Sequence, residues 1–425
     1  MIRSTFAHVD LGALAANFRA IVSFLARVSE ALPARRPPRV IAVVKANAYG
    51  HGAVPVGRAL ERAGATMLAC ADIEEAIVLR EGGVTCDILV FGALSVSDLE
   101  GIFEYGLTPT ISTPSAGRAL QRAAATRGVR LHYHLKIDTG MNRLGFRHDN
   151  LRTTLPELLG APDLALDAVY THFATADDPE DELFASQHRR FDAAIGQLAT
   201  LGVRPPALHA ANSAATLRDP RVWFDYVRPG ILLYGVSPSA GAKAPAYNPA
   251  SKEPPGPSND LVGRGFSPAN DAPSKGPAGP SRELPGRTSD LFLRPVLTLR
   301  SRVVAVKGVR VGEPVGYGAR FVAARPTDIA TVPAGYADGL DLRLAGRGAV
   351  LIAGRRAPIV GAVSMDMMAV DVTGIPVEPG DPVTILGADG DDTITVEEMA
   401  AAIGTIPYEI LCRVGTRIER VYNSG

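Results

Sequence analysis

One stretch decides the fold: VIAVVKANAYGHG, residues 40–52. Five aliphatic residues, 40–44, are followed directly by Lys45 and by a turn that contains Gly50 and Gly52. A continuous aliphatic run of this length is typical of a strand buried on both faces, as in a parallel sheet. We therefore expect a buried parallel strand that carries a lysine at its carboxyl end.

Seven further runs of the same kind follow, and most are separated by helical patterns such as residues 72–80 and 95–105. Strands that alternate with helices imply parallel pairing through right-handed crossovers. Eight such units predict a (β/α)8 TIM-type barrel rather than an open doubly wound sheet. A helix with Asp10 as its N-cap should precede them. The eight expected strands are 40–44, 66–70, 87–91, 108–111, 131–137, 165–171, 206–209 and 222–227.

The second half of the chain does not continue this alternation of strands and helices. A second domain is expected, because 425 residues exceed the usual size of one domain. Residues 241–290 contain 10 Pro, 7 Gly and 6 Ser, a composition typical of low-complexity or disordered segments. We predict a barrel over 1–238, a flexible insertion over 239–290, and a β-rich domain over 291–425. A docking function for the insertion is the alternative. Strands are expected at 292–306, 349–353, 358–363, 367–372 and 382–386, with one helix at 396–403.

Composition narrows the class of protein. Lys+Arg and Asp+Glu both number 44, so no charge excess favours a nucleic-acid or acidic-membrane partner. The three cysteines, 70, 86 and 412, are widely spaced and show no CxxC pattern, so we expect neither a disulfide framework nor a metal site. No uncharged run reaches the length of a membrane span. These features predict a soluble cytoplasmic protein.

Polar residues follow the ends of the expected strands. Lys45 would point into the mouth of the barrel, where a partly desolvated lysine can form a Schiff base with a carbonyl cofactor. A lysine that only extends to solvent is the alternative. Lys136 lies near the end of the fifth strand, and Arg143 follows seven residues later, beyond a glycine turn. Arg143 could bind a carboxylate, although two solvated cations on a surface turn would look the same.

The last three strands end in further polar groups, His172, Ser213 and Arg228. Taken singly, a histidine or a capping serine is usually structural. Their coincidence at one end of the barrel predicts a site instead. Ser213 and the amides of Gly230 and Ile231 would suit a phosphate, which barrel folds often bind near their last strands.

These residues resemble those of bacterial alanine racemases, and the resemblance covers nearly everything outside 241–290. Eight separate blocks occur in the order of that family, which makes the match specific. The matching blocks are 44–52, 136–145, 170–177, 209–215, 227–235, 333–339, 365–373 and 407–417.

The resemblance implies the catalytic roles. Lys45 looks like the lysine that holds pyridoxal phosphate as an aldimine and serves as one base. Tyr336 is similar to the opposite base, which the family supplies from the partner subunit of a homodimer. Arg143 and Met365 resemble the residues that contact the substrate, alanine. Lys136 lies where many members carry a carbamylated lysine.

The resemblance also implies the cofactor contacts. Arg228 matches the arginine that faces the pyridine nitrogen, and His172 looks like the histidine that supports it. An arginine there would keep that nitrogen neutral and so suppress transamination, which is our hypothesis. The residues that resemble the phosphate contacts are Tyr49, Ser213, Gly230, Ile231 and Tyr408.

The sequence departs from the family at Ser364, where cysteine is common, and at the Pro-rich insertion. Three alternatives remain. A pyridoxal-dependent decarboxylase on the same scaffold should have a carboxylate where Arg228 stands. A non-catalytic pyridoxal-phosphate-binding barrel would not need the second domain or Tyr336. A racemase of broader specificity differs only in the size of its pocket.

Overall fold

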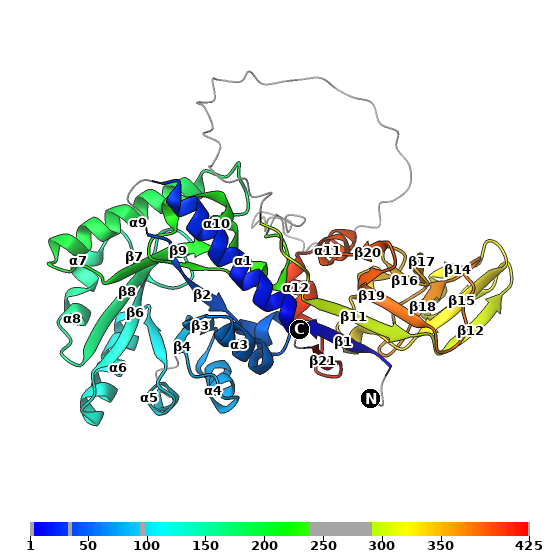
Figure 1. Ribbon diagram of the computed structural model, residues 1–425, viewed down its shortest axis with the longest axis horizontal. Coiled ribbons are helices and arrows are strands. Elements are labelled where there is room, and N and C mark those ends of the chain that lie inside the picture. Colours follow the sequence, from blue (N-terminus) through cyan, green and yellow to red (C-terminus); the bar gives the residue numbers. More distant parts are fainter. Residues whose placement is uncertain (1–3, 33–35, 94–98, 239–290, 424–425) are drawn as a thin grey trace, which may run out of the picture.

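The computed structural model describes residues 4–32, 36–93, 99–238 and 291–423. These form a barrel and a strand-rich domain that lie side by side (Figure 1). The predicted flexible insertion, 239–290, lies outside the described residues.

The barrel consists of eight parallel strands and is closed. Strand β10 pairs with β2, and β5 pairs with β6, so the eight strands form a closed ring. The two-residue strand β7 (Phe146–Arg147) is an addition that pairs with the end of β6. The (β/α)8 prediction is confirmed. The eighth strand was predicted to begin too early, because 220–222 form a 3-10 turn capped by Asp219 and the strand begins only at Tyr226. The barrel strands are β2 (Arg39–Val43), β3 (Met67–Cys70), β4 (Asp87–Val90), β5 (Thr108–Ile111), β6 (Leu131–Asp138), β8 (Leu164–Tyr170), β9 (Ala207–Asn212) and β10 (Tyr226–Arg228).

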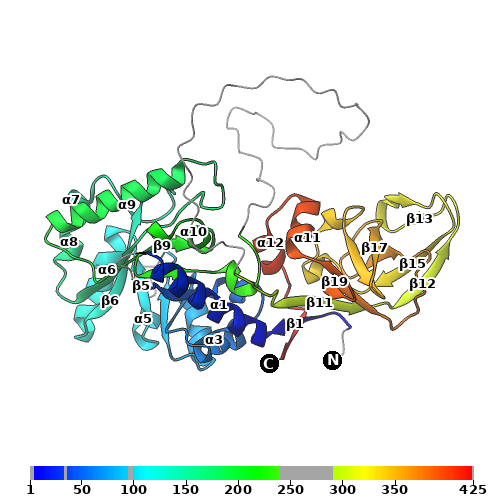
Figure 2. The same cartoon turned by 45° about the horizontal axis from the view of Figure 1, so that its top comes forward.

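Helices cover the outside of the barrel (Figure 2). Their buried residues pack on the strands; Leu60 of α3 and Leu79 of α4, for example, are fully buried. The helices are α1 (Leu11–Glu30), α3 (Ala53–Arg62), α4 (Ile73–Glu81), α5 (Glu100–Glu104), α6 (Pro114–Arg127), α9 (Leu183–Thr200) and α10 (Ser213–Arg218), with short turns α2 (Lys45–Tyr49), α7 (Leu151–Thr154) and α8 (Pro156–Leu159).

Helix α1 begins as predicted, because the Asp10 carboxylate accepts a hydrogen bond from the Ala13 amide at 2.7 Å. By length and composition this helix would suffice to cross a membrane. Its apolar face, however, is buried against the barrel, and Arg19 is exposed on the other face. The Asn17 side chain also donates to the Leu233 carbonyl at 3.0 Å, which holds the helix to the end of the barrel.

The second domain is built on a ten-stranded sheet. Its strand order is β12-β15-β18-β17-β16-β19-β11-β1-β21, with β20 beside β19. The strands are β11 (Leu297–Arg302), β12 (Ala305–Val309), β15 (Thr327–Val332), β16 (Ala349–Ile352), β17 (Arg355–Val360), β18 (Met368–Asp371), β19 (Pro382–Asp389), β20 (Asp392–Ile394) and β21 (Glu419–Asn423).

One member of this sheet comes from the other end of the chain. Strand β1 (Phe6–Asp10), which sequence position groups with the barrel, lies between β11 and β21. It pairs antiparallel with β11 and parallel with β21, and it leads directly into α1. The two domains are therefore connected twice, through β1 and through the segment before β11.

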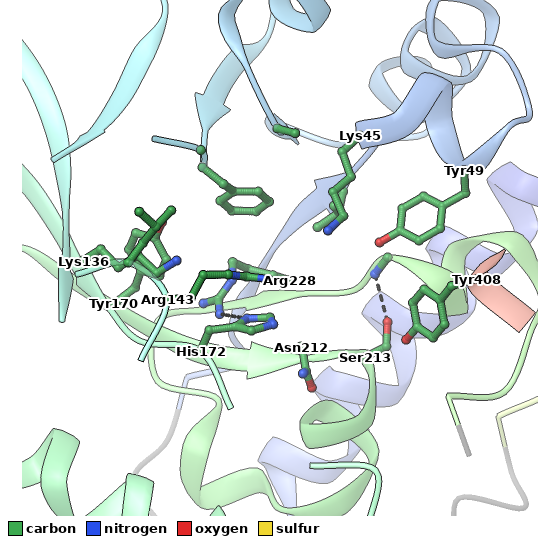
Figure 3. A pocket seen from close by; sticks show the side chains of 16 residues that line it. Lys45, Tyr49, Lys136, Arg143, Tyr170, His172, Asn212, Ser213, Arg228 and Tyr408 are labelled. Carbon is green, nitrogen blue, oxygen red and sulfur yellow. Dashed lines mark hydrogen bonds between the residues drawn. The ribbon is translucent and has the colours of Figure 1, made fainter. Parts of the chain in front are cut away.

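The prediction of helices in the second domain was incomplete. Helix α11 (Val396–Ile403) has the predicted bounds, with Thr395 as its N-cap. A second helix, α12 (Pro407–Cys412), was missed. It carries Tyr408 to the mouth of the barrel (Figure 3).

Candidate active site

A cavity of about 320 Å³ opens at the carboxyl ends of the barrel strands. Figure 3 shows cationic side chains along one part of it and hydroxyl groups along another, with the Lys45 side chain extending between them. The lining residues that the sequence had singled out are Lys45, Tyr49, Lys136, Arg143, His172, Ser213, Arg228, Gly230 and Tyr408.

Lys45 is presented by an unusual turn. The four residues after it, 46–49, all have φ between 52° and 55°, which makes a short left-handed turn without glycine. Each non-glycine residue in this conformation costs about 1–2 kcal/mol. Strain of this kind persists only where surrounding contacts hold it, and it is concentrated at functional sites. The turn directs the backbone away from β2 immediately after the lysine.

Arg228 is buried beneath the cavity and held from several sides. Its guanidinium donates to the carbonyls of Thr171 at 2.8 Å and Ala210 at 2.9 Å. It also contacts Nδ1 of His209 at 2.7 Å and Nδ1 of His172 at 3.3 Å. Because arginine only donates, both histidines must accept at Nδ1 and carry their proton on Nε2. This network fixes a permanent cation in one orientation.

Burial and the charge of Arg228 both act on these histidines. Burial, followed by Arg228, lowers the pKa of His172 and of His209 well below the usual value. Burial also lowers the pKa of Arg228 to about 10, which leaves it charged at neutral pH. The Tyr170 ring lies 5.1 Å from the guanidinium and stacks on His209. The site thus contains a charged arginine between two neutral imidazoles.

Two lysines in the cavity have lowered pKa values. Burial, and then the charge of Arg143, lowers the pKa of Lys45. The same causes, together with Arg228, lower the pKa of Lys136 to about 8. A neutral amine is the nucleophilic form, so both lysines are more reactive than a solvated lysine.

The hydroxyl-lined part of the cavity offers hydrogen-bond donors to an anion. Ser213 begins α10, and its Oγ accepts from the Gly230 amide at 2.9 Å. Burial raises the pKa of Tyr408 to about 12, so its phenol stays protonated. A Cβ at Gly230 would lie 2.2 Å from the Tyr49 hydroxyl, so only glycine permits this close approach. Ile231 is fully buried beside Gly230 and is not among the lining residues.

The other two predicted residues lie elsewhere in this chain. Tyr336 and Met365 line a separate hollow of about 560 Å³ on the second domain, and both are partly exposed. Tyr317 lines the same hollow and was missed. It lies between Gly316 and Gly318, both with positive φ, in the loop between β13 (Pro314–Val315) and β14 (Phe321–Val322). The sequence feature that could have identified Tyr317 is its position between two glycines, which is typical of a tight turn that presents a side chain.

Several other residues that line the barrel cavity were not predicted from the sequence. Phe91 and Gly92 follow β4, Ala71 follows β3, and Leu144 lies beside Arg143. Only their position in the sequence could have identified them as lining residues, because residues that directly follow a barrel strand lie at the mouth of the barrel.

A closed barrel with a reactive lysine, a fixed arginine and a donor-lined end defines a class of enzymes that bind an anionic carbonyl cofactor. The N-terminal domain model of alanine racemase matches residues 9–238, and the C-terminal domain model matches 296–422. The chain belongs to the alanine racemase family, whose members are pyridoxal-phosphate-dependent isomerases.

Individual relatives cover almost the whole chain. The alanine racemase of Symbiobacterium thermophilum is 38% identical over 99% of this chain and 97% of its own length. That of Carboxydothermus hydrogenoformans is 40% identical over 99% and 100%.

Solved structures of the family are similar too. The Bacillus anthracis enzyme with bound L-Ala-P has a TM-score of 0.80 at 34% identity and covers 100% of this chain and 96% of its own. The enzyme of D-cycloserine-producing Streptomyces lavendulae has a TM-score of 0.82 at 33% identity, with coverage of 100% and 98%.

Proposed function

We propose that this protein interconverts L-alanine and D-alanine with pyridoxal 5′-phosphate as its cofactor. The observation that carries the proposal is the barrel cavity, in which Lys45, Arg228 and a donor-lined anion site occur together. The named activity of the full-length relatives supports it. When bound, the cofactor supplies an electron sink that makes the α-proton of an amino acid easier to remove.

The residues of the cavity fit that cofactor. Gly230 leaves a space that a Cβ would fill, next to the hydroxyls of Tyr49 and Ser213. These groups and Tyr408 would hold the phosphate, and Ile231 would add its amide. Arg228 would face the pyridine nitrogen as a fixed cation, with His172 behind it.

Substrate binding and proton transfer fall to other side chains. Arg143 would hold the carboxylate of alanine, and Met365 of the partner subunit would lie near the substrate. Lys45 would remove or return the α-proton on one face. Inversion needs a second acid or base on the opposite face, which is why one lysine alone does not suffice. Carbamylation of Lys136 would place a carboxylate beside Arg143 and orient it.

The second base is a tyrosine of the hollow on the second domain. The resemblance assigns it to Tyr336, whose amide donates to the Ser364 carbonyl and whose side chain is 44% exposed. The geometry favours Tyr317, which is 77% exposed. A base that acts in the cavity of another subunit must protrude from its own, and Tyr317 protrudes further.

A homodimer follows from this division of the site. Within one chain, Lys45 and the two tyrosines line different cavities, so a second copy is needed to bring a tyrosine to the lysine. We further propose the division into a barrel (1–238), an insertion (239–290) and a β-rich domain (291–425), with the exception that β1 within the first segment pairs into the sheet of the β-rich domain. The unpaired cysteines and balanced charge support a cytoplasmic location without nucleic-acid or membrane partners.

The alternatives fit less well. A pyridoxal-dependent decarboxylase should have a carboxylate at the position of the buried Arg228 cation. A carrier of the cofactor has no use for two exposed tyrosines on a second domain. A broader amino-acid specificity is decided by substrate comparison.

The test is incubation of the cofactor-loaded enzyme with L-alanine in D2O, with NMR of the α-proton and a chiral assay of D-alanine in the same sample. Exchange together with D-alanine is expected. Exchange without inversion would indicate a single working base, and no exchange would contradict the proposal. L-serine in parallel measures specificity.

Tyr317→Phe and Tyr336→Phe then assign the second base. Each variant is incubated separately with L-alanine and with D-alanine. The base variant should lose inversion and should exchange only the enantiomer whose α-proton faces Lys45, while the other variant keeps inversion. Each variant must retain the bound-cofactor absorbance, so that a lost cofactor is not mistaken for a lost base.

A further inference from the structure

The left-handed turn after Lys45 needs a contact that holds it. Residues 46–48 have φ and ψ near +50°, a conformation that alanine seldom adopts. Asn47 contributes one contact, because its side chain accepts from the Ala53 amide at 2.7 Å. That contact holds the C-terminal side of the turn. The backbone amide of Ala46, directly after the lysine, needs a hydrogen-bond acceptor of its own.

Glu75 supplies that partner. It lies in the first turn of α4, and its Oε1 accepts from the Ala46 amide at 2.6 Å. Its other oxygen, Oε2, accepts from the Ala71 amide at 2.8 Å. One carboxylate therefore connects the turn after β2 to the loop after β3. Hydrogen bonds to an ionised group are roughly twice as strong as neutral ones.

We propose that Glu75 is a positioning residue for Lys45: its carboxylate holds the left-handed turn and thereby fixes the amine in the cavity. The proposal rests on the function proposed above. Glu75 touches neither substrate nor cofactor in this arrangement, and it acts through the backbone of Ala46. Ala71, its other partner, itself lines the cavity, so the carboxylate links two walls of the site.

A purely local role in α4 accounts for the bond to Ala71, which lies just before the helix, but not for the bond to Ala46, which is 29 residues away in sequence. The N-cap of α4 is Asp72, whose carboxylate accepts from the Glu75 amide at 2.8 Å. The Glu75 side chain reaches back to the Ala71 amide at the start of its helix and also across to the Ala46 amide after β2. Glu74 occupies the same first turn and is exposed, so it carries the same charge near the helix terminus and serves as a matched control.

The experiment compares Glu75→Gln with Glu74→Gln in the full chain. A glutamine at position 75 presents one oxygen and one NH2 group. It can therefore accept only one of the two backbone hydrogen bonds, and its NH2 group faces the N–H of the other amide, which is also a donor. We expect kcat per cofactor-loaded site to fall about 10- to 100-fold with KM nearly unchanged, because small misplacements of a reacting group have effects of that size. Glu74→Gln should behave as wild type.

A second readout does not depend on activity. Hydrogen exchange of the peptide over residues 45–50, followed by mass spectrometry with and without the cofactor, should be faster in Glu75→Gln than in Glu74→Gln. If Glu75→Gln fails to fold, Glu75→Asp retains the charge but is too short to reach both amides, and the same changes are expected.

Rescue separates positioning from a general structural effect. Glycine adopts positive φ without strain, so Ala46→Gly should restore part of the kcat lost in Glu75→Gln. The proposal is overturned if Glu75→Gln keeps kcat within about twofold of Glu74→Gln, if exchange over 45–50 is unchanged, or if glycine restores nothing. Absence of racemisation in the wild type would contradict the proposed function instead, and the exchange comparison would still decide the role of Glu75.

Discussion

Replacement of Gly230 by alanine tests the proposed phosphate site through shape alone. The added methyl would lie 2.2 Å from the Tyr49 hydroxyl and 2.9 Å from its Cζ. Tyr49 cannot withdraw easily, because it is buried and its ring lies 4.9 Å from that of Tyr234 and 6.0 Å from that of Tyr408. Overpacking of this kind costs about 1–3 kcal/mol.

Since the strain is relieved by moving Tyr49 off the anion site, we expect it to appear as weaker cofactor binding. An energy of about 1–3 kcal/mol corresponds to a dissociation constant about 5- to 150-fold higher. The assay is titration of apoprotein with pyridoxal 5′-phosphate, followed by absorbance. Gly196→Ala is the control, because a Cβ there, in helix α9, meets nothing within 4 Å.

Combination with Tyr49→Phe sharpens the test. Removal of the hydroxyl relieves the closest contact, so Gly230→Ala should weaken binding less in that background than in the wild type. Cofactor affinity within about twofold of wild type in a folded Gly230→Ala protein would refute the reasoning.

Three further predictions concern charge. Because the pKa of Lys136 is lowered to about 8, more of its amine is neutral as the pH rises, and the neutral amine attacks dissolved CO2 and loses a proton to form the carbamate. At a fixed concentration of dissolved 13CO2, labelling should therefore speed up with pH until about 8 and then level. The label should be absent from Lys136→Arg, and an unchanged signal in that variant would exclude carbamylation there. Arg228→Glu should increase side transamination, measured as pyruvate, and an amount no greater than wild type would count against the role of the arginine. Burial lowers the pKa of His51 and of His134 to about 4, so the folded protein binds fewer protons than the unfolded chain between pH 4 and about 6.5, and stability is lost as pH falls through that range. Each of these two histidines should lower the free energy of unfolding by about 2 kcal/mol between pH 7 and pH 5. Urea denaturation at the two pH values should show a smaller loss of stability in His51→Gln than in the wild type. An equal loss in both proteins would contradict the role given to His51.

The barrel was predictable because its signals are local. Each buried strand is a short aliphatic run, and several side chains of the candidate site lie at the end of such a run or soon after it, as Lys45 follows β2 and Arg228 ends β10. The start of β10 was not predictable in this way, since Val222 looks like strand but follows a proline capped by Asp219. Hydrophobic pattern alone does not identify a capped 3-10 turn.

The second domain was harder to predict because its strands depend on partners far away in sequence. Strand β12 is largely exposed and has little apolar pattern, and β15 pairs with both β12 and β18. Tyr317 was missed for a related reason: its importance lies in its exposure, which only the folded chain reveals. The site assignments that rest on resemblance remain predictions for the variants above.

The position of β1 has a consequence for how the chain matures on the ribosome. Residues 6–10 leave the exit tunnel long before their neighbours in the sheet, which are 297–300 and 419–423. Contacts of such sequence separation form slowly, and an unpaired strand edge is prone to aggregation. The barrel strands can close around their core while β1 waits for the last strand to be translated. Synthesis interrupted shortly before residue 419 should therefore yield nascent chains with an exposed sheet edge next to α1, which makes them candidates for chaperone capture.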